Sequence, residues 1–294
     1  MLEKNKIVFV VKGGSENGYG HAYRCKEIIK HLKVIPIIFT KNHEIIEFFD
    51  SNIPYIQCFQ YKDFHTVSKY IMNNRVCGII FDCHGPERKE IEILKNIKTV
   101  AIECITDACY NCNILIDSQR QPDQISNHLF GLDFVIIRDE FFFIRKKSPI
   151  EEIKKIAIIC GGSSKAFEIY NDIRESILKY NFDILNPYVF SNYIEYISNA
   201  DAAITAGGVG MYELAFLGIP FIAFPLVKHQ KKNIENFILN GGKCIYMKNN
   251  YEIDKYLNIL LHQDNYEQFY ANQKIIDGKG LERILAALEE FGVI

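Results

Sequence analysis

Short apolar runs alternate with amphipathic segments along the whole chain. The run at 7–11 contains no polar position, as expected for a parallel strand that is covered on both faces. Within 21–32, by contrast, apolar residues such as Ala22, Cys25 and Ile29 recur at helical spacing. Strands and helices in alternation are typical of parallel, doubly wound sheets.

The same pattern predicts two α/β halves. In the first half we expect strands at 6–12, 34–40, 76–81, 98–103 and 113–117, and helices at 21–32, 42–49, 64–73 and 86–96. A charged segment at 146–152 contains Pro149 and separates the halves. In the second half we expect strands at 155–160, 182–185, 202–205, 220–224 and 243–247, and helices at 165–179, 192–200, 209–217, 230–239, 251–262, 266–275 and 280–291. The sequence therefore predicts two Rossmann-like domains, 1–148 and 149–294, with a ligand cleft between them.

A glycine turn joins the strand at 202–205 to the helix at 209–217. Gly207, Gly208 and Gly210 let the backbone approach a ligand closely, and the helix that begins at Val209 directs its N–H groups toward that turn. Glu213, about one turn into the helix, could accept hydrogen bonds from a ribose. An ordinary strand–turn–helix corner would explain the glycines equally well.

Two further glycine-rich loops follow strands, at 13–20 and at Gly161–Gly162. None of the loops is a Walker A loop or a complete dinucleotide fingerprint, but each can gather backbone amides around a phosphate or a sugar.

The first half holds the candidate catalytic residues. His21 follows Gly20 at a helix start, where the dipole favours a neutral ring that can accept a proton; it could instead cap its own helix. Asp82 and His84 follow a central strand, where active-site residues collect in open α/β sheets, although Asp-x-x-Gly-Pro is also good turn chemistry. Glu103 and Asp107 close the neighbouring strand with the same ambiguity.

Charge and hydropathy narrow the possible partners. The chain has 34 basic and 36 acidic residues, a net charge of -2, and so no nucleic-acid partner is predicted. The longest uncharged apolar stretch, 214–227, is interrupted by glycine and proline, and the run at 7–11 is too short for a signal-peptide core. We expect a cytoplasmic protein without membrane insertion. Its oligomeric state is left open, with a monomer as one option.

Nine cysteines fit a reducing compartment, because the count is odd and Cys25, Cys77, Cys160 and Cys244 fall inside predicted elements. We therefore expect reduced thiols and no disulfide framework. Cys104, Cys109 and Cys112 have the spacing of some iron–sulfur ligands, but a fourth cysteine in a suitable place is missing. No metal or other cofactor is predicted.

Five motifs occur together in one order: Gly18-Tyr-Gly-His-Ala-Tyr-Arg24, Ile79-Ile-Phe-Asp82 with Gly85, Ile136-Ile-Arg-Asp-Glu-Phe141, Ile158-Ile-Cys-Gly-Gly162, and Ile204-Thr-Ala-Gly-Gly-Val-Gly-Met-Tyr-Glu213 followed by His229-Gln230. Over residues 1–250 the chain thereby resembles the UDP-sugar hydrolases of pseudaminic acid biosynthesis. These are related in fold to the N-acetylglucosaminyltransferase that makes lipid II.

The resemblance implies a GT-B fold and hydrolysis of UDP-2,4-diacetamido-2,4,6-trideoxy-β-L-altropyranose to release UDP. It assigns His21 to water activation and Arg24 to the loop or the sugar side. The second domain would bind UDP, with its diphosphate, ribose and neighbouring contacts supplied by Gly161, Gly162, Gly207, Gly208, Val209, Glu213 and Gln230.

Three positions depart from the family pattern. His84 replaces a tyrosine, Cys104 follows Glu103 where paired aspartates are common, and His229 replaces an asparagine. These changes concern the sugar more than UDP. Two other functions stay open: a GT-B glycosyltransferase that uses a UDP-sugar donor, and a non-catalytic nucleotide-sugar-binding protein.

Overall fold

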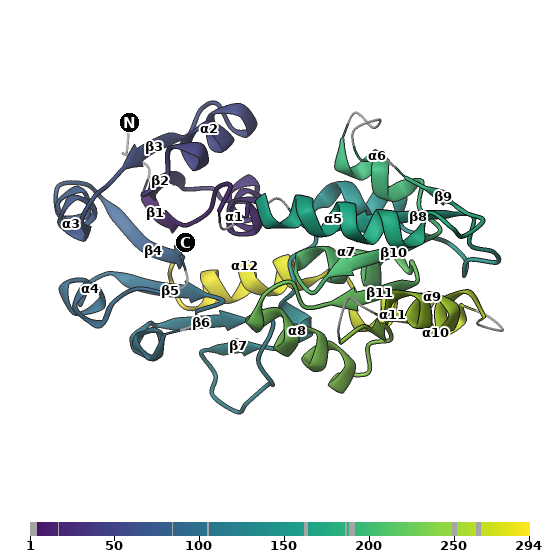
Figure 1. The fold of residues 1–294 in the computed structure, drawn as a ribbon. Helices are drawn as coiled ribbons and strands as arrows, with labels where there is room; N and C mark the ends of the chain where they lie inside the picture. Colours follow the sequence, from purple (N-terminus) through teal and green to yellow (C-terminus); the bar gives the residue numbers. More distant parts are fainter. Residues whose placement is uncertain are drawn as a thin grey trace. The chain divides into compact units, whose positions relative to one another are not determined.

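The computed structural model describes residues 5–16, 18–83, 85–104, 106–161, 164–185, 187, 192–248, 252–262 and 266–294. It divides into two compact units, Met1–Ile136 with Lys279–Ile294, and Ile137–Gly278. Figure 1 shows both units as α/β layers coloured along the sequence.

The first unit is built on a seven-stranded sheet in the order β3-β2-β1-β4-β5-β6-β7, and all its strand pairs are parallel. Its strands are β1 (Lys6–Val11), β2 (Ile35–Thr40), β3 (Gln57–Gln60), β4 (Val76–Asp82), β5 (Lys98–Ile102), β6 (Ile114–Asp117) and β7 (His128–Phe130). Its helices are α1 (Gly20–Lys30), α2 (His43–Asn52), α3 (Phe64–Met72), α4 (Arg88–Ile93), the short 3-10 helices η1 (Asp107–Asn111) and η2 (Leu132–Phe134), and α12 (Gly280–Glu290).

Alternate residues of the central strand serve two apolar cores. Ile7 and Phe9 of β1 pack on one face of the sheet with residues of α1, α2 and α12, whereas Val8 and Val10 pack on the other face with α3. The central strands β1 and β4 are therefore apolar over most of their length because both of their faces are covered, as the sequence pattern predicted.

The second unit has a five-stranded parallel sheet in the order β12-β11-β10-β8-β9. Its strands are β8 (Lys155–Ile159), β9 (Asp183–Ile184), β10 (Ala202–Ala206), β11 (Phe221–Phe224) and β12 (Ile245–Tyr246). Its helices are η3 (Asp139–Ile144), α5 (Ser164–Ile177), α6 (Tyr193–Ser198), α7 (Val209–Leu217), α8 (Lys228–Leu239), α9 (Ile253–Leu261), α10 (Glu267–Tyr270) and α11 (Asn272–Ile275).

The observed units differ from a single division of the chain at residue 148. One segment before this residue belongs to the second unit, and one segment near the end of the chain belongs to the first. The η3 segment belongs to the second unit, because Phe142 packs on Phe216 of α7 with ring centroids 4.8 Å apart. The last helix, α12, belongs to the first unit, because Leu281, Ile284 and Leu288 join the core beneath β1. The chain therefore enters the second unit and returns to the first, with α12 in yellow in Figure 1.

Two strands were not predicted from the sequence. β3 is an edge strand with mostly exposed side chains, and β7 has only three residues, so neither produces an apolar run. The predicted helix at 266–275 is divided at Ala271 into α10 and α11. Among the described residues, no helix has both the length and the apolar character needed to cross a membrane.

Candidate functional site

The carboxyl end of β4 and the start of α1 bring three predicted residues together in the first unit. Asp82 ends β4, where it pairs in register with Val11 of β1. His21 and Arg24 are three residues apart on α1 and so share a face of that helix. The cluster formed by His21, Arg24 and Asp82 is called the His21 cluster below.

Asp82 is the centre of this cluster. Its Oδ1 lies 2.5 Å from His21 Nδ1 and accepts a hydrogen bond of 2.7 Å from Arg24 Nη2, while its Oδ2 accepts one of 2.8 Å from Arg24 Nε. Asp82 is completely buried, which opposes ionisation. The charges of Arg24 and His21 outweigh this burial, and they hold the pKa of the Asp82 carboxyl well below its usual range.

Contact with Asp82 has a chemical consequence for His21. A carboxylate that accepts from Nδ1 fixes the tautomer with the proton on Nδ1 and the lone pair on Nε2. It also stabilises the imidazolium that forms when Nε2 takes a proton. The arrangement is that of a general base with its orienting carboxylate.

The glycine loop before α1 is held by the start of α2. Gly14 and Gly18 exchange backbone hydrogen bonds of 3.1 and 2.7 Å, and Gly18 has a φ of +76°. Asn42 donates to the Gly13 carbonyl at 2.9 Å, and Glu44 accepts from Ser15. Asn42 also caps α2, as predicted. The loop therefore fixes the position of Gly20, the first residue of α1.

Arg24 binds carboxylates. Besides Asp82, its Nη1 contacts Glu103 Oε2 at 2.5 Å. The resemblance had assigned Arg24 to the loop or the sugar side, and the ion pairs to Asp82 and Glu103 were not predicted. His84 lies outside the described residues.

In the second unit, the predicted glycine turn lies between β10 and α7. The helix begins after Gly208, which has no side chain to cap the first turn, and Val209 is its first residue. The first N–H groups of an α-helix have no partner within the helix and favour an anion. This turn and the start of α8 form the segment that we call the glycine corner, defined by Gly207, Gly208, Val209 and Gln230.

Close packing at Gly207 requires glycine. A Cβ there would lie 2.7 Å from Ile234 Cγ1 and 2.9 Å from the Gln230 carbonyl, both on α8. Asn233 of α8 donates to the Gly207 carbonyl at 2.9 Å, and the Gln230 side chain accepts from the Leu226 N–H at 2.8 Å. The starts of α7 and α8 are thus fixed beside each other.

Glu213 is buried behind the glycine corner. Its Oε1 accepts from Arg138 Nε at 2.9 Å and lies 2.7 Å from Arg138 Nη2, and the carboxylate also forms a hydrogen bond with Tyr193. Burial raises the pKa of the Glu213 carboxyl, and Arg138 opposes this effect only in part. Arg138 and Tyr193 were not predicted as partners of Glu213. An arginine directly after the buried pair Ile136–Ile137 was the available signal.

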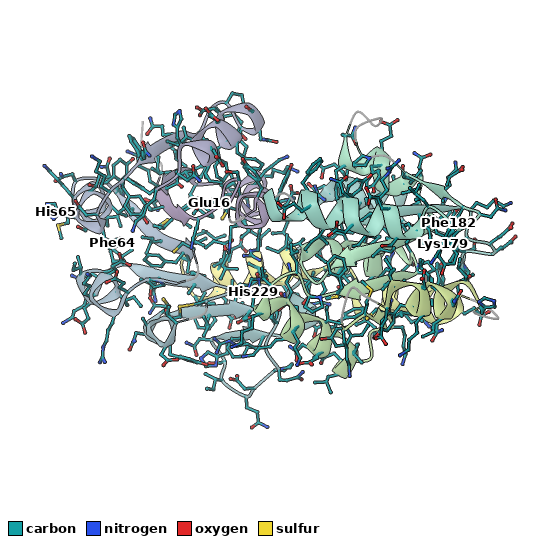
Figure 2. All side chains as sticks on the ribbon, viewed as in Figure 1. Glu16, Phe64, His65, Lys179, Phe182 and His229 are labelled. Atoms are coloured by element: carbon teal, nitrogen blue, oxygen red, sulfur yellow. A yellow bond between two sulfur atoms is a disulfide. The ribbon has the colours of Figure 1, made fainter. Side chains whose placement is uncertain are left out.

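The remaining predicted residues of this unit are more exposed. Gly161 follows β8 with a φ of +91°, and open space surrounds the position of a Cβ there. Gly162 lies outside the described residues. His229, labelled in Figure 2, is exposed in the first turn of α8.

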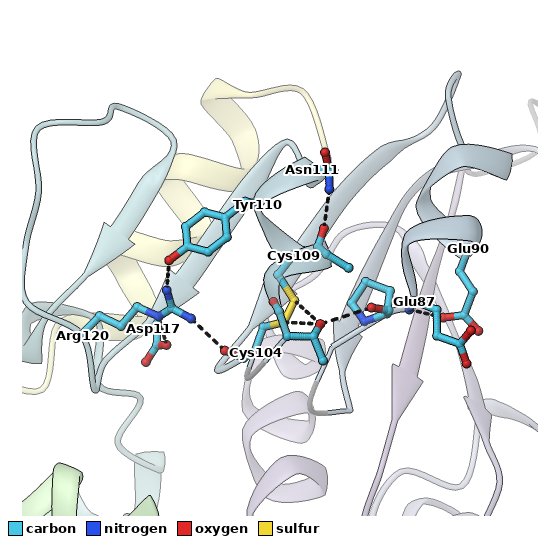
Figure 3. Close-up of a disulfide and its surroundings, with 11 residues drawn as sticks. Glu87, Glu90, Cys104, Cys109, Tyr110, Asn111, Asp117 and Arg120 are labelled. Carbon is cyan, nitrogen blue, oxygen red and sulfur yellow. Dashed lines mark hydrogen bonds and ion pairs between the residues drawn. A yellow bond between two sulfur atoms is a disulfide. The ribbon is translucent and has the colours of Figure 1, made fainter.

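The cysteines near the His21 cluster differ from the prediction. Cys104 and Cys109 form a disulfide, with Cα atoms 6.3 Å apart (Figure 3). The expectation of reduced thiols is therefore wrong for this pair, because the 3-10 turn of η1 brings Cys109 back to the end of β5. It is confirmed for Cys25, Cys77, Cys160 and Cys244, which are free. Among the described residues, no group of three or more histidine, cysteine or acidic side chains could hold a metal ion.

Known proteins resemble this chain over most of its length. The spore coat polysaccharide biosynthesis protein SpsG of Bacillus subtilis is 22% identical, over 95% of this chain and 96% of its own. The uncharacterized protein MJ1062 of Methanocaldococcus jannaschii is 23% identical over 85% of this chain, which spans 62% of that protein.

Solved structures share the fold at low identity. MurG of Acinetobacter baumannii matches with a TM-score of 0.67 and 10% identity, covering 97% of this chain and 99% of its own. LpCGTa, solved in complex with UDP, matches with a TM-score of 0.64 and 10% identity, covering 99% of this chain and 100% of its own. The predicted GT-B fold is confirmed, whereas a ligand cleft between its two units stays a prediction.

The model of the glycosyltransferase family 28 C-terminal domain matches residues 136–285, just over half of the chain. That range contains the glycine corner and Glu213 with its partner Arg138. The chain belongs to the family defined by this glycosyltransferase family 28 C-terminal domain.

Proposed function

We propose that this protein is a UDP-sugar hydrolase, with UDP-2,4-diacetamido-2,4,6-trideoxy-β-L-altropyranose as substrate. The observation that carries the proposal is the contact between His21 Nδ1 and Asp82, at the start of α1 directly after a glycine loop. The second unit supplies the nucleotide site, and its family membership and the UDP complex of LpCGTa support this assignment.

In the proposed reaction, His21 Nε2 accepts a proton from water as the water oxygen attacks the anomeric carbon. The bond between this carbon and the β-phosphate oxygen breaks, and its electron pair leaves with UDP. Asp82 stabilises the imidazolium through Nδ1, and general-base catalysis of this kind contributes roughly 10²- to 10⁴-fold in rate. The products are UDP and the free sugar.

The glycine corner is proposed to bind the diphosphate. The helix start after Gly208 offers N–H groups and the positive end of the α7 dipole. In the resemblance Glu213 binds the ribose, but here its Oε1 contacts Arg138 and the side chain is 5% exposed. We therefore assign Glu213 to holding the first turn of α7, and Gly161, Gly208 and Gln230 to the nucleotide.

The test is UDP release from the altrose nucleotide without any acceptor. We expect turnover by the wild-type protein, and at least about a 100-fold loss in His21→Ala with UDP affinity unchanged. His65→Ala is the matched control, because His65 is an exposed histidine of the same unit on α3 (Figure 2). Full turnover by His21→Ala would refute the mechanism.

A glycosyltransferase is the second candidate, and the family 28 match is the observation that favours it. It would use the same nucleotide site with a hydroxyl acceptor in place of water. UDP release that requires an added acceptor would support it. UDP binding without turnover of any UDP-sugar in a panel would instead indicate a non-catalytic binding protein.

A further inference from the structure

Glu103 follows β5 and has an unusual backbone conformation. Its φ is +47°, and it is the one non-glycine residue with positive φ in the described part of the chain. A glutamate in the left-handed region costs on the order of 1 kcal/mol and persists only where the surroundings fix it.

Four contacts hold this segment in place. The Glu103 N–H donates to the Ile116 carbonyl of β6 at 2.7 Å. The next carbonyl, that of Cys104, accepts from Arg120 Nη2 at 3.1 Å, and Cys104 is bonded to Cys109 (Figure 3). Gly85, on the loop after β4, packs so closely on both sulfurs that a Cβ there would overlap them. The end of β5 is thus fixed to β6, η1 and the loop after Asp82.

The Glu103 side chain is fixed as well. Its Oε1 accepts from Ser118 Oγ at 2.8 Å, and its Oε2 lies 2.5 Å from Arg24 Nη1. Arg24 is therefore held from two sides, by Asp82 through Nε and Nη2 and by Glu103 through Nη1. Arg24 Nη2 lies 3.1 Å from His21 Nδ1. Glu103 is thus joined to the imidazole through the guanidinium of Arg24 and through Asp82 Oδ1, which accepts from both Arg24 and His21.

We propose that Glu103 is a positioning residue that acts through Arg24 on the His21–Asp82 contact. This inference depends on the catalytic assignment of His21 in the proposed function. Asp82 alone would anchor the guanidinium by one edge, and Arg24 could then turn about that edge. Since Asp82 Oδ1 accepts from both Arg24 and His21, any turn of Arg24 changes the geometry offered to the imidazole.

Glu103→Gln is the variant of choice because it removes the charge and keeps the shape and the acceptor for Ser118. Glu92→Gln is its matched control, because Glu92 is an exposed glutamate on α4 of the same unit. If Glu103→Gln does not fold, Glu103→Asn replaces it, since asparagine tolerates the left-handed backbone.

The first measurement needs no substrate. Nitrogen-15 NMR of the imidazoles reports the tautomer and the Nδ1 proton, and His21→Ala identifies the His21 signals. We expect the wild type and Glu92→Gln to show the Nδ1–H tautomer with a strongly downfield proton, and Glu103→Gln to lose or shift that proton. Unchanged His21 signals in Glu103→Gln would overturn the proposal.

The second measurement is steady-state UDP release from the altrose nucleotide. We expect kcat of Glu103→Gln to fall about 10- to 100-fold with KM within about twofold and an unchanged melting temperature. A loss of kcat no greater than the loss of folded protein would reduce Glu103 to a structural role and overturn the proposal. If the wild type has no turnover, the proposed function fails, while the NMR measurement still decides whether Glu103 orients His21.

Discussion

Asp82 in the first unit and Glu213 in the second are both buried carboxylates paired with an arginine, yet their pKa shifts are opposite. Asp82 receives Arg24 on both oxygens and His21 on one of them, and these charges outweigh burial. Glu213 receives Arg138 on Oε1 and a hydrogen bond from Tyr193, and burial prevails. The free-energy cost of burying a carboxylate is offset by the number and geometry of the hydrogen bonds that it accepts. A nearby arginine therefore does not by itself decide whether the pKa of the carboxyl rises or falls.

The two candidate sites also differ in the groups that they offer to a ligand. The His21 cluster consists of polar side chains whose roles depend on exact contacts. The glycine corner consists of backbone groups and the absence of side chains at Gly207 and Gly208. A site of the first kind suits a reacting atom, whereas one of the second kind suits a ligand that is bound unchanged.

The largest expected difference in stability and turnover is the one between two variants that each neutralise a buried carboxylate, Asp82→Asn and Glu213→Gln. Asp82→Asn leaves Arg24 buried without its main partner, and we expect a loss of about 3–5 kcal/mol in the free energy of unfolding and about 10³-fold in turnover. Glu213→Gln should cost about 1 kcal/mol, since burial already favours its neutral form. Urea unfolding of both variants tests the contrast, and equal losses would contradict it.

Two glycine variants test the second unit with a smaller expected effect. Gly207→Ala places a methyl group against Ile234 and the Gln230 carbonyl, and we expect a loss of about 1–3 kcal/mol. Gly208→Ala has 3.5 Å to the nearest atom, the Gln230 Nε2, and should keep its stability while UDP affinity falls about tenfold. Calorimetry measures both quantities. An unchanged UDP affinity in Gly208→Ala would remove the glycine corner from the nucleotide site.

Removing the disulfide should affect the first unit alone. Cys104 and Cys109 are five residues apart, and a loop of that size contributes about 2 kcal/mol by the chain-entropy argument. We expect the Cys104→Ser/Cys109→Ser protein to unfold at a lower urea concentration. We also expect its turnover to fall, because the segment of Glu103 loses one of the contacts that hold it. Cys112→Ser is the control, since Cys112 is a free, buried thiol of the same apolar cluster. A stability equal to that of the control would show that the bond contributes nothing.

The smallest effect is a difference in pH dependence. The folded pKa of Asp82 lies below its unfolded value, so its contribution to stability is present above pH about 4 and is lost as the pH falls further. The folded pKa of Glu213 is raised, so the folded state gains stability as the pH falls toward about 4.5 and loses it as the pH rises. The measurement is the slope of the free energy of unfolding against pH. The difference between the wild-type slope and that of Asp82→Asn or Glu213→Gln gives the contribution of each carboxyl group. Slopes of the same sign would contradict the comparison.

Much of the fold could be predicted from the sequence because buried parallel strands appear in it as uninterrupted apolar runs. β1, β4, β10 and β11 are of this kind, and β3 and β7 are not. Glycines at a strand end likewise indicate a turn whatever the rest of the chain does. For these features, the information is local.

The contacts within the candidate sites are different. His21 and Asp82 were each singled out, but their contact joins residues 61 positions apart and depends on β4 lying next to β1. Arg138 and Glu213 are 75 positions apart, and the role of Glu103 depends on a backbone conformation that glutamate rarely adopts. A single sequence can mark the individual residues by their place at a strand end or a helix start, but it contains no signal for which of them pair.

Because α12 belongs to the first unit, the residues of the two cores are synthesised in a particular order. Ile7 and Phe9 leave the ribosome early, but the residues that cover them on α12, Ile284 among them, are made after every residue of the second unit. The second unit can therefore close its core before α12 completes the cover that α1 and α2 give to one face of the first sheet. The core of the first unit is thus completed by residues that are made after the whole of the second unit.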